Sequence, residues 1–410
     1  MDTRYKIQDT RYKAHRVFVA LSGGVDSSVT AFLLKKAGYD ISCVFMRFWR
    51  NPRFPEENPC CSLESETRAR ILAKSLKAPF FIFDFEKEFK EEVVDYFLER
   101  TGQGFTPNPC VVCNQEIKFG LFLKKSLKMG ADFVATGHYA RIARHQGFQT
   151  PDVQIPARFG ILRARPVTEH KSVLCSDHAD GAARVVCQPY VSLLKAKDRE
   201  KDQSYFLWRL SQKQLSRTLF PVGDYTKTEV RKLASRHKLA AARTKDSQNL
   251  CFLAGETAEF LKNYLKGKAG AIVDSKSKII GRHPGLGFFT IGQRQGIVAN
   301  LFPKEQSRGP FYVLKKDLKR NTLIVTTKEK DLFKKELIAA RINWIFGRPP
   351  KLPLKVKARI RSRQKEVEAL ISEAGKRIRV NFKKPERAIT PGQSIVFYKG
   401  EELLGGGVIL

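Results

Sequence analysis

The first third of the chain alternates short apolar runs with longer segments in which apolar positions recur every three or four residues. The apolar runs are RVFVAL, ISCVFM, FFIFDF and DFVATG, and each has the length of a buried strand. The segments between them predict a helix after the first run and further helices near 63–77, 87–100 and 115–129. Strands that are apolar throughout and alternate with helices are typical of a doubly wound parallel α/β sheet.

The pattern changes twice further along the chain. Helical periodicity continues from about residue 206 to residue 270, and Thr226 ahead of Glu229 predicts a capping box for one of these helices. From about residue 271 onward, short alternating runs are separated by turn residues, which predicts a small antiparallel β-barrel.

These changes predict three domains. We expect an N-terminal α/β domain over 1–205, a central helical domain over 206–270 and a C-terminal β-barrel over 271–410. The stretch 144–195 fits neither a strand pattern nor a helix pattern. It is expected to be a long loop or insertion within the first domain.

Basic residues are in large excess. The 410 residues include 75 Lys and Arg against 41 Asp and Glu, which gives a formal net charge of +34. Such a balance indicates a polyanionic partner, because each phosphate that a protein neutralises releases counterions. A generally basic proteome gives the same balance without a specific partner. The segment 351–390 holds thirteen Lys and Arg against four Asp and Glu, which favours a nucleic-acid surface in the barrel.

No apolar run reaches the about 18 residues expected of a membrane span. The start, MDTRYKIQDTRYKAHR, contains acids and has no apolar signal core. We therefore expect a cytoplasmic protein with no membrane partner. Its eight cysteines are then expected to be reduced thiols used in chemistry or metal binding, and not a disulfide scaffold.

The stretch SGGVDSS lies between the first predicted strand and the first predicted helix. Gly23 and Gly24 lack side chains, so the backbone can approach a phosphate closely. Asp26 or Ser27 is expected to cap the helix, whose free N–H groups and dipole favour an anion. An ordinary glycine turn is the alternative. The loop lacks the Gly-Lys-Ser/Thr ending of a Walker loop, and it resembles the pyrophosphate-loop motif of enzymes that cleave ATP between its α- and β-phosphates.

Three motifs directly follow strands of the predicted sheet. SGGVDSS follows the first strand, FMRFW the second and ATGHYAR the fourth. In open α/β sheets, ligands bind beyond the carboxyl ends of the strands. We therefore expect the three motifs to meet in one crevice, which favours a nucleotide site over a simple turn.

Cysteines stand at two places where thiol chemistry is expected. Cys110 and Cys113, in GFTPNPCVVCNQEIKFG, follow a proline-rich loop and precede a predicted helix. The helix dipole acidifies a thiol at this position, so that more of it is thiolate at neutral pH. Cys251 lies far along the chain in TKDSQNLCFLAGE. Structural zinc is the alternative, with Cys60 and Cys61 as the further ligands, but adjacent cysteines chelate poorly, and no metal site is predicted.

A set of motifs in fixed order resembles the tRNA-specific 2-thiouridylase family. The set comprises SGGVDSS, TPNPCVVCNQEIKFG, ATGHYAR, KDQSYFLWRL, DSQNLCFL, TIGQRQGI, and TPGQSIVFY with GGGVI. These motifs span residues 19–409 in the family's order, so the resemblance covers nearly the whole chain. It implies a pyrophosphate-loop ATPase sheet in the N-terminal domain and tRNA contacts in the C-terminal barrel.

The resemblance implies a tRNA-uridine 2-sulfurtransferase that uses ATP, with Mg²⁺, to replace the C2 oxygen of the wobble uridine by sulfur. ATP adenylates this oxygen, pyrophosphate leaves, and a protein persulfide delivers sulfur as AMP departs. A carbonyl oxygen is a poor leaving group until it carries AMP, and the sulfur must arrive as an activated, thiolate-like species. The implied partners are the tRNAs for lysine, glutamate and glutamine, and a sulfur donor that is either a relay protein or a cysteine desulfurase.

The resemblance also implies site residues by motif match. Cys251 carries the persulfide, and Cys113 is the nucleophile that forms a transient disulfide with it. The implied ATP-binding residues are Ala20, Leu21, Ser22, Gly23, Gly24, Val25, Asp26, Ser27, Met46 and Gly137. The residues implied to contact the flipped target base are Asn108, Pro109 and Cys110. Those implied to contact the tRNA elsewhere are His138, Lys201, Asp202, Gln203, Arg361, Ser362 and Gln393.

Three alternatives stay open at this point. One is another pyrophosphate-loop tRNA modifier, such as a thiolase for a different base or a lysidine-forming ligase, although a ligase has no need of Cys113 and Cys251. The second is an RNA-binding module with a relict nucleotide fold, which the intact loop disfavours. In the third, Cys110, Cys113 and Cys251 hold an iron–sulfur cluster that delivers sulfide. Some relatives have aspartate at the position of Cys110, which favours the persulfide relay over the cluster.

Overall fold

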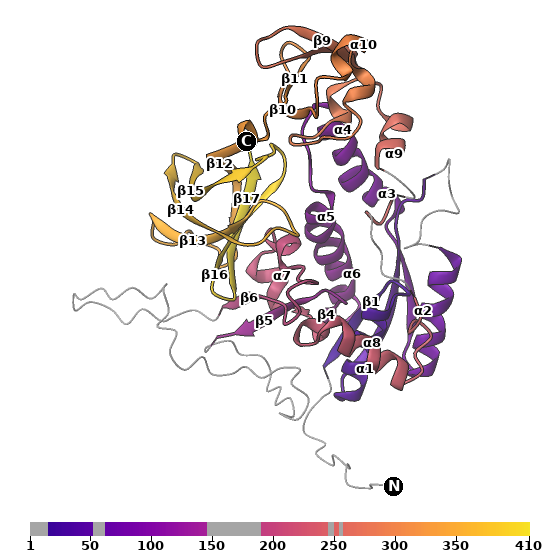
Figure 1. Cartoon of the computed structure of the whole chain (residues 1–410). Coiled ribbons are helices and arrows are strands. Elements are labelled where there is room, and N and C mark those ends of the chain that lie inside the picture. Colours follow the sequence, from indigo (N-terminus) through magenta and orange to yellow (C-terminus); the bar gives the residue numbers. More distant parts are fainter. Residues whose placement is uncertain (1–14, 52–61, 146–189, 245–249, 254–256) are drawn as a thin grey trace, which may run out of the picture.

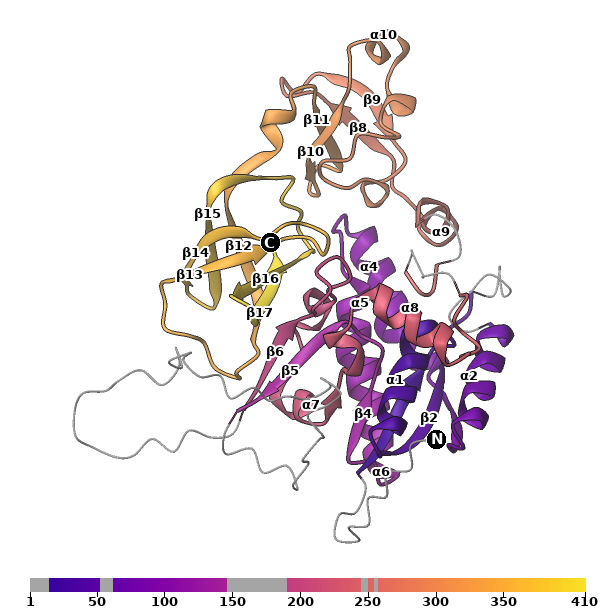
Figure 2. The same cartoon turned by 60° about the horizontal axis from the view of Figure 1, so that its bottom comes forward.

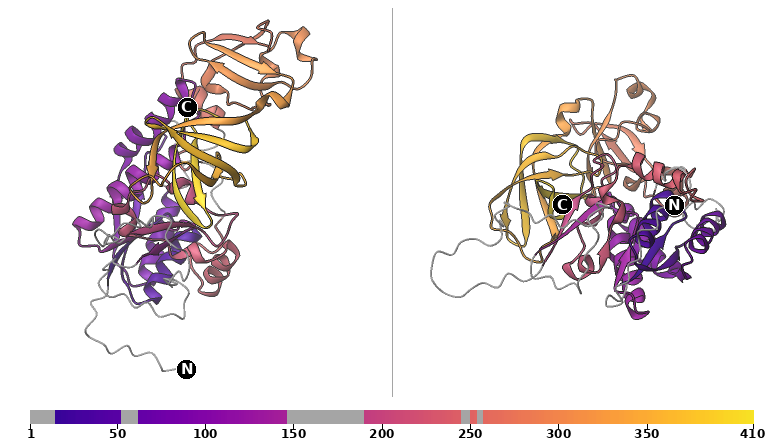
Figure 3. Two further views of the ribbon diagram at one scale, coloured as in Figure 1. Left: turned by 90° about the vertical axis from the view of Figure 1, so that its left-hand side faces the viewer. Right: turned by 90° about the horizontal axis from the view of Figure 1, so that it is seen from below.

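The computed structural model describes residues 15–51, 62–145, 190–244, 250–253 and 257–410. Within these ranges the chain forms a parallel sheet with helices, a four-stranded sheet and a larger sheet that closes into a barrel. Figures 1 and 3 show an elongated molecule, with the four-stranded sheet at one end, the parallel sheet at the other and the barrel between them. In this part of the chain no helix has the length and apolar character needed to cross a membrane.

The parallel sheet has the strand order β3-β2-β1-β4-β7. Its strands are β1 (Arg16–Leu21), β2 (Asp40–Arg47), β3 (Phe80–Asp84), β4 (Phe133–Ala135) and β7 (Thr218–Leu219). The first four coincide with the four apolar runs of the sequence, because strands covered by helices on both faces bury most of their side chains. The predicted doubly wound α/β sheet is confirmed.

Helices follow the strands as the periodicity predicts. Helices α1 (Val25–Lys36) and α2 (Leu63–Ser75) are regular, whereas the other two predicted helices each contain a π-helical stretch. The first of these comprises α3 (Glu86–Phe89), η2 (Lys90–Asp95) and α4 (Tyr96–Gly102). The second comprises α5 (Pro109–Val112), η3 (Cys113–Leu121) and α6 (Phe122–Lys128). Such stretches are frequent at functional sites, and η3 begins at Cys113.

The strand order reverses at β1, which has β2 on one side and β4 on the other. This is the topological switch point, where open α/β sheets bind ligands beyond the carboxyl ends of the strands. SGGVDSS follows β1 and the sequence Thr136-Gly137-His138 follows β4. The fold therefore brings these two motifs to the same end of neighbouring strands.

The segment 206–270 contains α7 (Gln212–Ser216), α8 (Lys227–Arg236) and α9 (Thr257–Tyr264). The predicted capping box is present in α8, where the Thr226 and Glu229 side chains accept each other's backbone N–H. The same segment supplies β7 to the parallel sheet, and α8 packs against α1 (Figure 2). This segment is thus tied to the α/β sheet, and the predicted domain boundaries at 205 and 270 stay predictions.

The strands expected over 271–410 fall into two sheets with separate cores. The smaller sheet has the order β10-β11-β8-β9. Its strands are β8 (Gly270–Val273), β9 (Ile279–His283), β10 (Tyr312–Asp317) and β11 (Thr322–Thr326). The barrel therefore begins later than residue 271, at β12.

The barrel has the strand order β12-β15-β14-β13-β16-β17, and a pairing of β12 with β17 closes it. Its strands are β12 (Phe333–Trp344), β13 (Leu354–Arg359), β14 (Val367–Ala374), β15 (Arg377–Arg387), β16 (Ser394–Lys399) and β17 (Glu402–Ile409). All the neighbours in this ring are antiparallel, so the predicted antiparallel barrel is confirmed.

Two strands from the N-terminal half extend the barrel sheet. Strand β6 (Val191–Lys195) pairs with β17, and β5 (Ala140–Arg144) pairs with β6. Residues 191–195 are therefore a strand, although they belong to the stretch expected to be a loop. The remainder of that predicted insertion, residues 146–189, lies outside the described residues.

Candidate active site

The SGGVDSS loop forms a tight turn between β1 and α1. Ala20 and Leu21 end the strand, and Gly23 has a φ of +70°. A Cβ atom at Gly23 would lie 2.3 Å from the carbonyl oxygen of Ser65, so only glycine fits there. The prediction that Asp26 or Ser27 caps α1 is wrong. The N-cap is Gly24, and no side chain caps the helix, because the Ser27 hydroxyl instead accepts the N–H of Ser22 and donates to the carbonyl of Gly24.

Gly137 lies directly against the first turn of α1. A Cβ atom on Gly137 would be 2.7 Å from the nitrogen of Ser27 and 2.9 Å from the carbonyl carbon of Asp26. Backbone atoms cannot move away as a flexible side chain can, so this position requires glycine. The predicted meeting of the motif after β1 with the motif after β4 is observed.

Helix α2 connects the end of β2 to the same loop. Arg47, beside the buried Met46, forms an ion pair of 3.0 Å with Glu66 of α2. Arg68, from the same helix, donates its Nε hydrogen to the carbonyl of Gly23 over 3.0 Å. The end of β2 therefore lies next to the loop through α2, although Arg68 is not among the residues that the motifs single out.

Asp26 is held by two residues that are not among the expected site residues, although one of them, Tyr139, lies within the motif ATGHYAR. Its carboxylate oxygens lie 2.7 and 2.8 Å from Nζ of Lys227 at the start of α8, and one oxygen accepts the Tyr139 hydroxyl at 2.8 Å. Tyr139 is buried and the Lys227 side chain is 12% exposed. A lysine in the first turn of a helix is disfavoured, because its charge lies at the positive end of the helix dipole. This unfavourable position of Lys227 is the feature of the sequence that indicates a role other than helix formation.

The cysteines of interest lie on segments that share one hydrophobic core. Cys113 is buried at the start of η3, while Cys110 in α5 and Cys251 are partly exposed. Cys251 packs against the same core cluster that contains Cys113, and the adjacent Phe252 contacts the ring of Phe97 with a centroid separation of 5.7 Å. The cysteines of the described ranges form no disulfide with one another. The same ranges contain no group of three or more His, Cys, Asp and Glu side chains arranged to hold a metal ion.

The loop that precedes Cys110 is braced by the barrel. Gln393 donates from its side-chain amide to the carbonyl of Thr106 over 3.0 Å, and the N–H of Thr106 donates to the carbonyl of Pro391, also over 3.0 Å. Asn108 is hydrogen-bonded to Tyr205, whose hydroxyl donates to the carbonyl of Ser394 at 2.8 Å. Burial raises the pKa of Tyr205, so its hydroxyl stays a donor. Residues expected to contact the target base thus lie beside barrel residues expected to contact tRNA.

Arg361 belongs to the same region. Its guanidinium donates to the carbonyl of Ala388 over 2.9 Å and is close enough to Tyr205 to affect the pKa of that phenol. Burial, and the neighbouring Arg387 as a smaller cause, lower the pKa of Arg361. Ser362, next along the chain, is partly exposed in the turn after β13.

The residues of the KDQ motif, Lys201, Asp202 and Gln203, make structural contacts within the protein that the sequence motif does not predict. Asp202 is fully buried as a side chain and pairs with Arg359 of the barrel at 2.9 Å. Gln203 accepts the N–H of Tyr139 over 2.9 Å, while Lys201 is partly exposed. Asp202 and Gln203 therefore join the α/β sheet to the barrel, and of the three residues only Asp202 is buried.

His138 is buried between aromatic rings. Its ring centroid lies 5.7 Å from that of Phe119 in η3 and 6.0 Å from that of Phe220, and its Nδ1 is 2.7 Å from the Thr136 hydroxyl. Burial, with Lys118 as a smaller cause, holds the pKa of His138 well below its usual value, so the ring is neutral at pH 7. Through Phe119, the motif after β4 contacts the helix that begins at Cys113.

The basic residues of the barrel line its outer face. Strand β13 alternates buried apolar residues with exposed lysines, and β15 does the same with arginines and lysines. The exposed members are Lys355, Lys357, Arg377, Arg379, Lys383 and Lys384. This alternation leaves a positive surface that suits the phosphate backbone of a nucleic acid.

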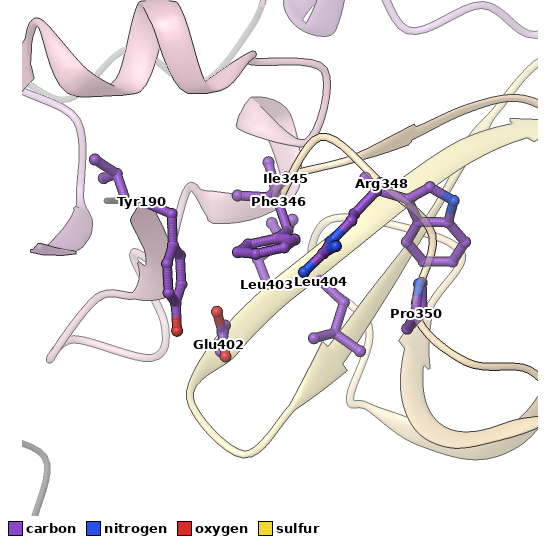
Figure 4. Close-up of a pocket in the computed structure, with 10 residues that line it drawn as sticks. Tyr190, Ile345, Phe346, Arg348, Pro350, Glu402, Leu403 and Leu404 are labelled. Carbon is purple, nitrogen blue, oxygen red and sulfur yellow. The ribbon is translucent and has the colours of Figure 1, made fainter. Parts of the chain in front are cut away.

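A pocket in the described part of the molecule lies between β6 and the barrel, apart from the residues expected to bind ATP or tRNA (Figure 4). Its wall is mainly apolar and aromatic, with Tyr190, Phe346 and Leu403 among the lining residues. The guanidinium of Arg348 lies 4.9 Å from the ring centroid of Phe346. No residue of the expected ATP or tRNA sites lines this pocket.

Family models match the chain in three consecutive parts. They are the tRNA methyl transferase HUP domain over residues 15–255, the tRNA methyl transferase PRC-barrel domain over 258–327 and the Aminomethyltransferase beta-barrel domain over 334–409. The tRNA-specific 2-thiouridylase MnmA of Roseiflexus castenholzii is 40% identical over 400 residues, which cover 96% of this chain and 99% of that protein. The protein of the same name from Enterococcus faecalis is 39% identical over 399 residues, with coverage of 96% and 95%. The three matched parts follow the order of the parallel sheet, the four-stranded sheet and the barrel.

Proposed function

This chain belongs to the tRNA-specific 2-thiouridylase family, and we propose on that premise that it is a tRNA-uridine 2-sulfurtransferase acting on the wobble uridine. The observation that carries the proposal is the packing of Gly137 against the first turn of α1. This packing supports a nucleotide site at the switch point of the sheet, and His138, beside Gly137, contacts Phe119 of the helix that begins at Cys113.

The first step activates the uridine. Residues 20–27, with Met46 and Gly137, hold ATP, and the uncapped first turn of α1 offers N–H groups to its phosphates. Mg²⁺ binds phosphates together with one or two carboxylates, and Asp26 is the carboxylate of this loop. The uridine O2 attacks the α-phosphorus and forms the O2–P bond, while the bond to pyrophosphate breaks with its electron pair on pyrophosphate. The N3 proton leaves, so C2 becomes double-bonded to N3.

The second step exchanges oxygen for sulfur. A persulfide donor, either a relay protein or a cysteine desulfurase, loads a sulfane sulfur on Cys251. The terminal sulfur attacks C2, and AMP departs with O2 and the bonding electrons. The Cys113 thiolate then attacks Sγ of Cys251 to form their disulfide, which leaves the second sulfur and its electron pair on C2. N3 regains a proton, and a thiol reductant restores both cysteines, as the reducing cytoplasm allows.

The tRNA is held by the barrel and by the loop before Cys110. Support for this comes from the contacts of Gln393 with Thr106 and of Tyr205 with Asn108, and from the basic face of β13 and β15. The family implies the tRNAs for lysine, glutamate and glutamine. Their wobble uridine would be flipped from its stack to reach Asn108, Pro109 and Cys110.

The experiment is a reconstitution with a tRNA transcript, ATP, Mg²⁺ and a small-molecule persulfide donor, followed by mass analysis of the nucleosides. We expect 2-thiouridine, AMP and pyrophosphate in equal amounts. Cys113→Ser and Cys251→Ser should still release pyrophosphate but make no 2-thiouridine, whereas Cys43→Ser, in buried β2, is the matched control and should be active. Formation of 2-thiouridine by Cys251→Ser, or none by the unaltered protein, would contradict the proposal.

A further inference from the structure

Lys227 occupies a position in helix α8 that is unfavourable for a positively charged side chain. It is the first residue of α8, where the helix dipole is positive and a cation is disfavoured. The N-terminus of α8 is already satisfied without this side chain, by the capping box of Thr226 and Glu229. The backbone N–H of Lys227 donates to Asp198 over 2.8 Å. Helix formation therefore does not account for a lysine here.

The Lys227 ammonium points at the phosphate loop. Its Nζ lies 2.7 and 2.8 Å from the two oxygens of Asp26, in the first turn of α1, and 5.8 Å from the ring centroid of Tyr139. Its side chain is only 12% exposed, although lysine is among the residues least often buried. A largely buried ammonium, paired with Asp26, is thus held at the uncapped end of α1, where the polyphosphate of ATP is expected.

We propose that Lys227 is a catalytic residue of the adenylation step, whose ammonium stabilises the charge that develops on pyrophosphate as it leaves. This inference rests on the proposed function. As the uridine O2–P bond forms and the bond to the bridging oxygen breaks, an additional negative charge develops on pyrophosphate. A preorganised cation stabilises that charge more in the transition state than in bound ATP. Asp26 holds the ammonium in place, and the leaving pyrophosphate becomes its additional partner in the transition state.

The competing explanation is a structural ion pair that only fastens α8 to α1. The two explanations differ in what a neutral side chain changes. Removal of one partner of a buried pair lowers stability whatever the substrate does. Loss of an interaction made only in the transition state lowers kcat and kcat/KM equally and leaves ground-state ATP affinity nearly unchanged.

The test measures tRNA-stimulated pyrophosphate release, ATP affinity without tRNA, tRNA affinity and the melting temperature for Lys227→Met, Lys227→Arg and the control Lys232→Met. Lys232 is exposed on the same helix. We expect Lys227→Met to lower kcat by about 100-fold or more, with both affinities within about threefold of the unaltered protein. Lys227→Arg should recover at least tenfold, which is about 1.4 kcal/mol, because its charge remains. Lys232→Met should match the unaltered protein.

Two results on the Lys227 variants would overturn the inference. One is a kcat of Lys227→Met within about threefold of Lys232→Met. The other is a melting temperature that falls together with kcat in both Lys227 variants, since a structural pair predicts this. If the unaltered protein releases no pyrophosphate with any tRNA, adenylation itself is refuted, and the Lys227 assignment with it. The measurement on the unaltered protein therefore distinguishes a failure of the proposed function from a failure of the Lys227 assignment alone.

Discussion

Replacing Asp202 with asparagine should destabilise the junction between the α/β sheet and the barrel by about 3 kcal/mol. The Asp202 side chain is 0% exposed and pairs with Arg359, itself 9% exposed, at 2.9 Å. It also accepts the N–H of Ala196 at 3.0 Å and the hydroxyl of Ser204 at 2.9 Å. Breaking a buried pair on one side costs about 3–5 kcal/mol, because the other charge stays buried without its partner. The lower end applies here, since asparagine still accepts the N–H of Ala196 and Glu366 still pairs with Arg359.

The assay is urea-induced unfolding followed by tryptophan fluorescence, because buried Trp208 lies at this junction and donates to the Ser394 hydroxyl over 3.0 Å. The control is Glu401→Gln, which removes a carboxylate that pairs with Arg141 and Arg199 but is 51% exposed. Exposed ion pairs contribute about 0–1 kcal/mol to stability, so the free energy of unfolding of Glu401→Gln should be close to that of the unaltered protein. If Asp202→Asn lowers the free energy of unfolding by less than about 1 kcal/mol, the prediction for the buried Asp202–Arg359 pair is refuted. A weaker affinity for tRNA with unchanged stability would instead support a direct tRNA contact.

Four further predictions follow from the same structure. Gly137→Ala places a Cβ atom 2.7 Å from a backbone nitrogen of α1, so we expect the KM for ATP to rise by about tenfold or more, measured by pyrophosphate release. His138, whose pKa burial holds well below the usual value, is neutral when folded but binds a proton when unfolded below about pH 6.5. The free energy of unfolding should therefore fall as pH decreases through that value, and His138→Gln should flatten the dependence. Charge reversal at Arg361 and Arg363 should weaken tRNA binding and reduce its salt slope by about 0.7–0.9 per lost phosphate contact; an unchanged slope would assign them no phosphate contact. Cys110→Ser should retain much of the thiolation activity, whereas joint loss of activity and of bound iron after anaerobic purification would favour the cluster.

Strand prediction succeeded where burial alone decides the pattern. The four apolar runs became β1 to β4, because both faces of a parallel sheet are covered. Strand β14, VEALISEA, was not predicted, since Glu, Ala and Leu favour helix in isolation and only its pairing with β13 and β15 makes it a strand. Strand β17 contains three successive glycines, an unfavourable strand composition. A Cβ atom at Gly406 would lie 2.9 Å from the ring of Trp208, which explains the glycine but cannot be read from local sequence.

The residues of the candidate site also fall into those that the sequence predicts and those that depend on tertiary contacts. The loop after β1 and the glycine after β4 were predicted, because the order of strands and motifs places them at one edge of the sheet. Lys227 was missed, since it lies in no motif and reaches Asp26 from 201 residues away. Tyr139 lies within the motif ATGHYAR, but its hydrogen bond to Asp26 was not predicted. The predicted helix cap was wrong because α1 begins at Val25, after the N-cap Gly24, so that Asp26 and Ser27 lie inside its first turn. The burial of Asp202 and His138 likewise depends on tertiary packing, which a motif does not encode.

The central claim is that ATP activates the C2 oxygen of a tRNA uridine, and an oxygen-18 label at that position tests it most directly. A tRNA carrying the label at C2 of its wobble uridine is thiolated with ATP, Mg²⁺ and a persulfide donor, and the AMP released is analysed by mass spectrometry. The account predicts one labelled oxygen in AMP for each 2-thiouridine formed, because O2 leaves on the α-phosphorus. Unlabelled AMP, with the label released to water or retained in the tRNA, would contradict it.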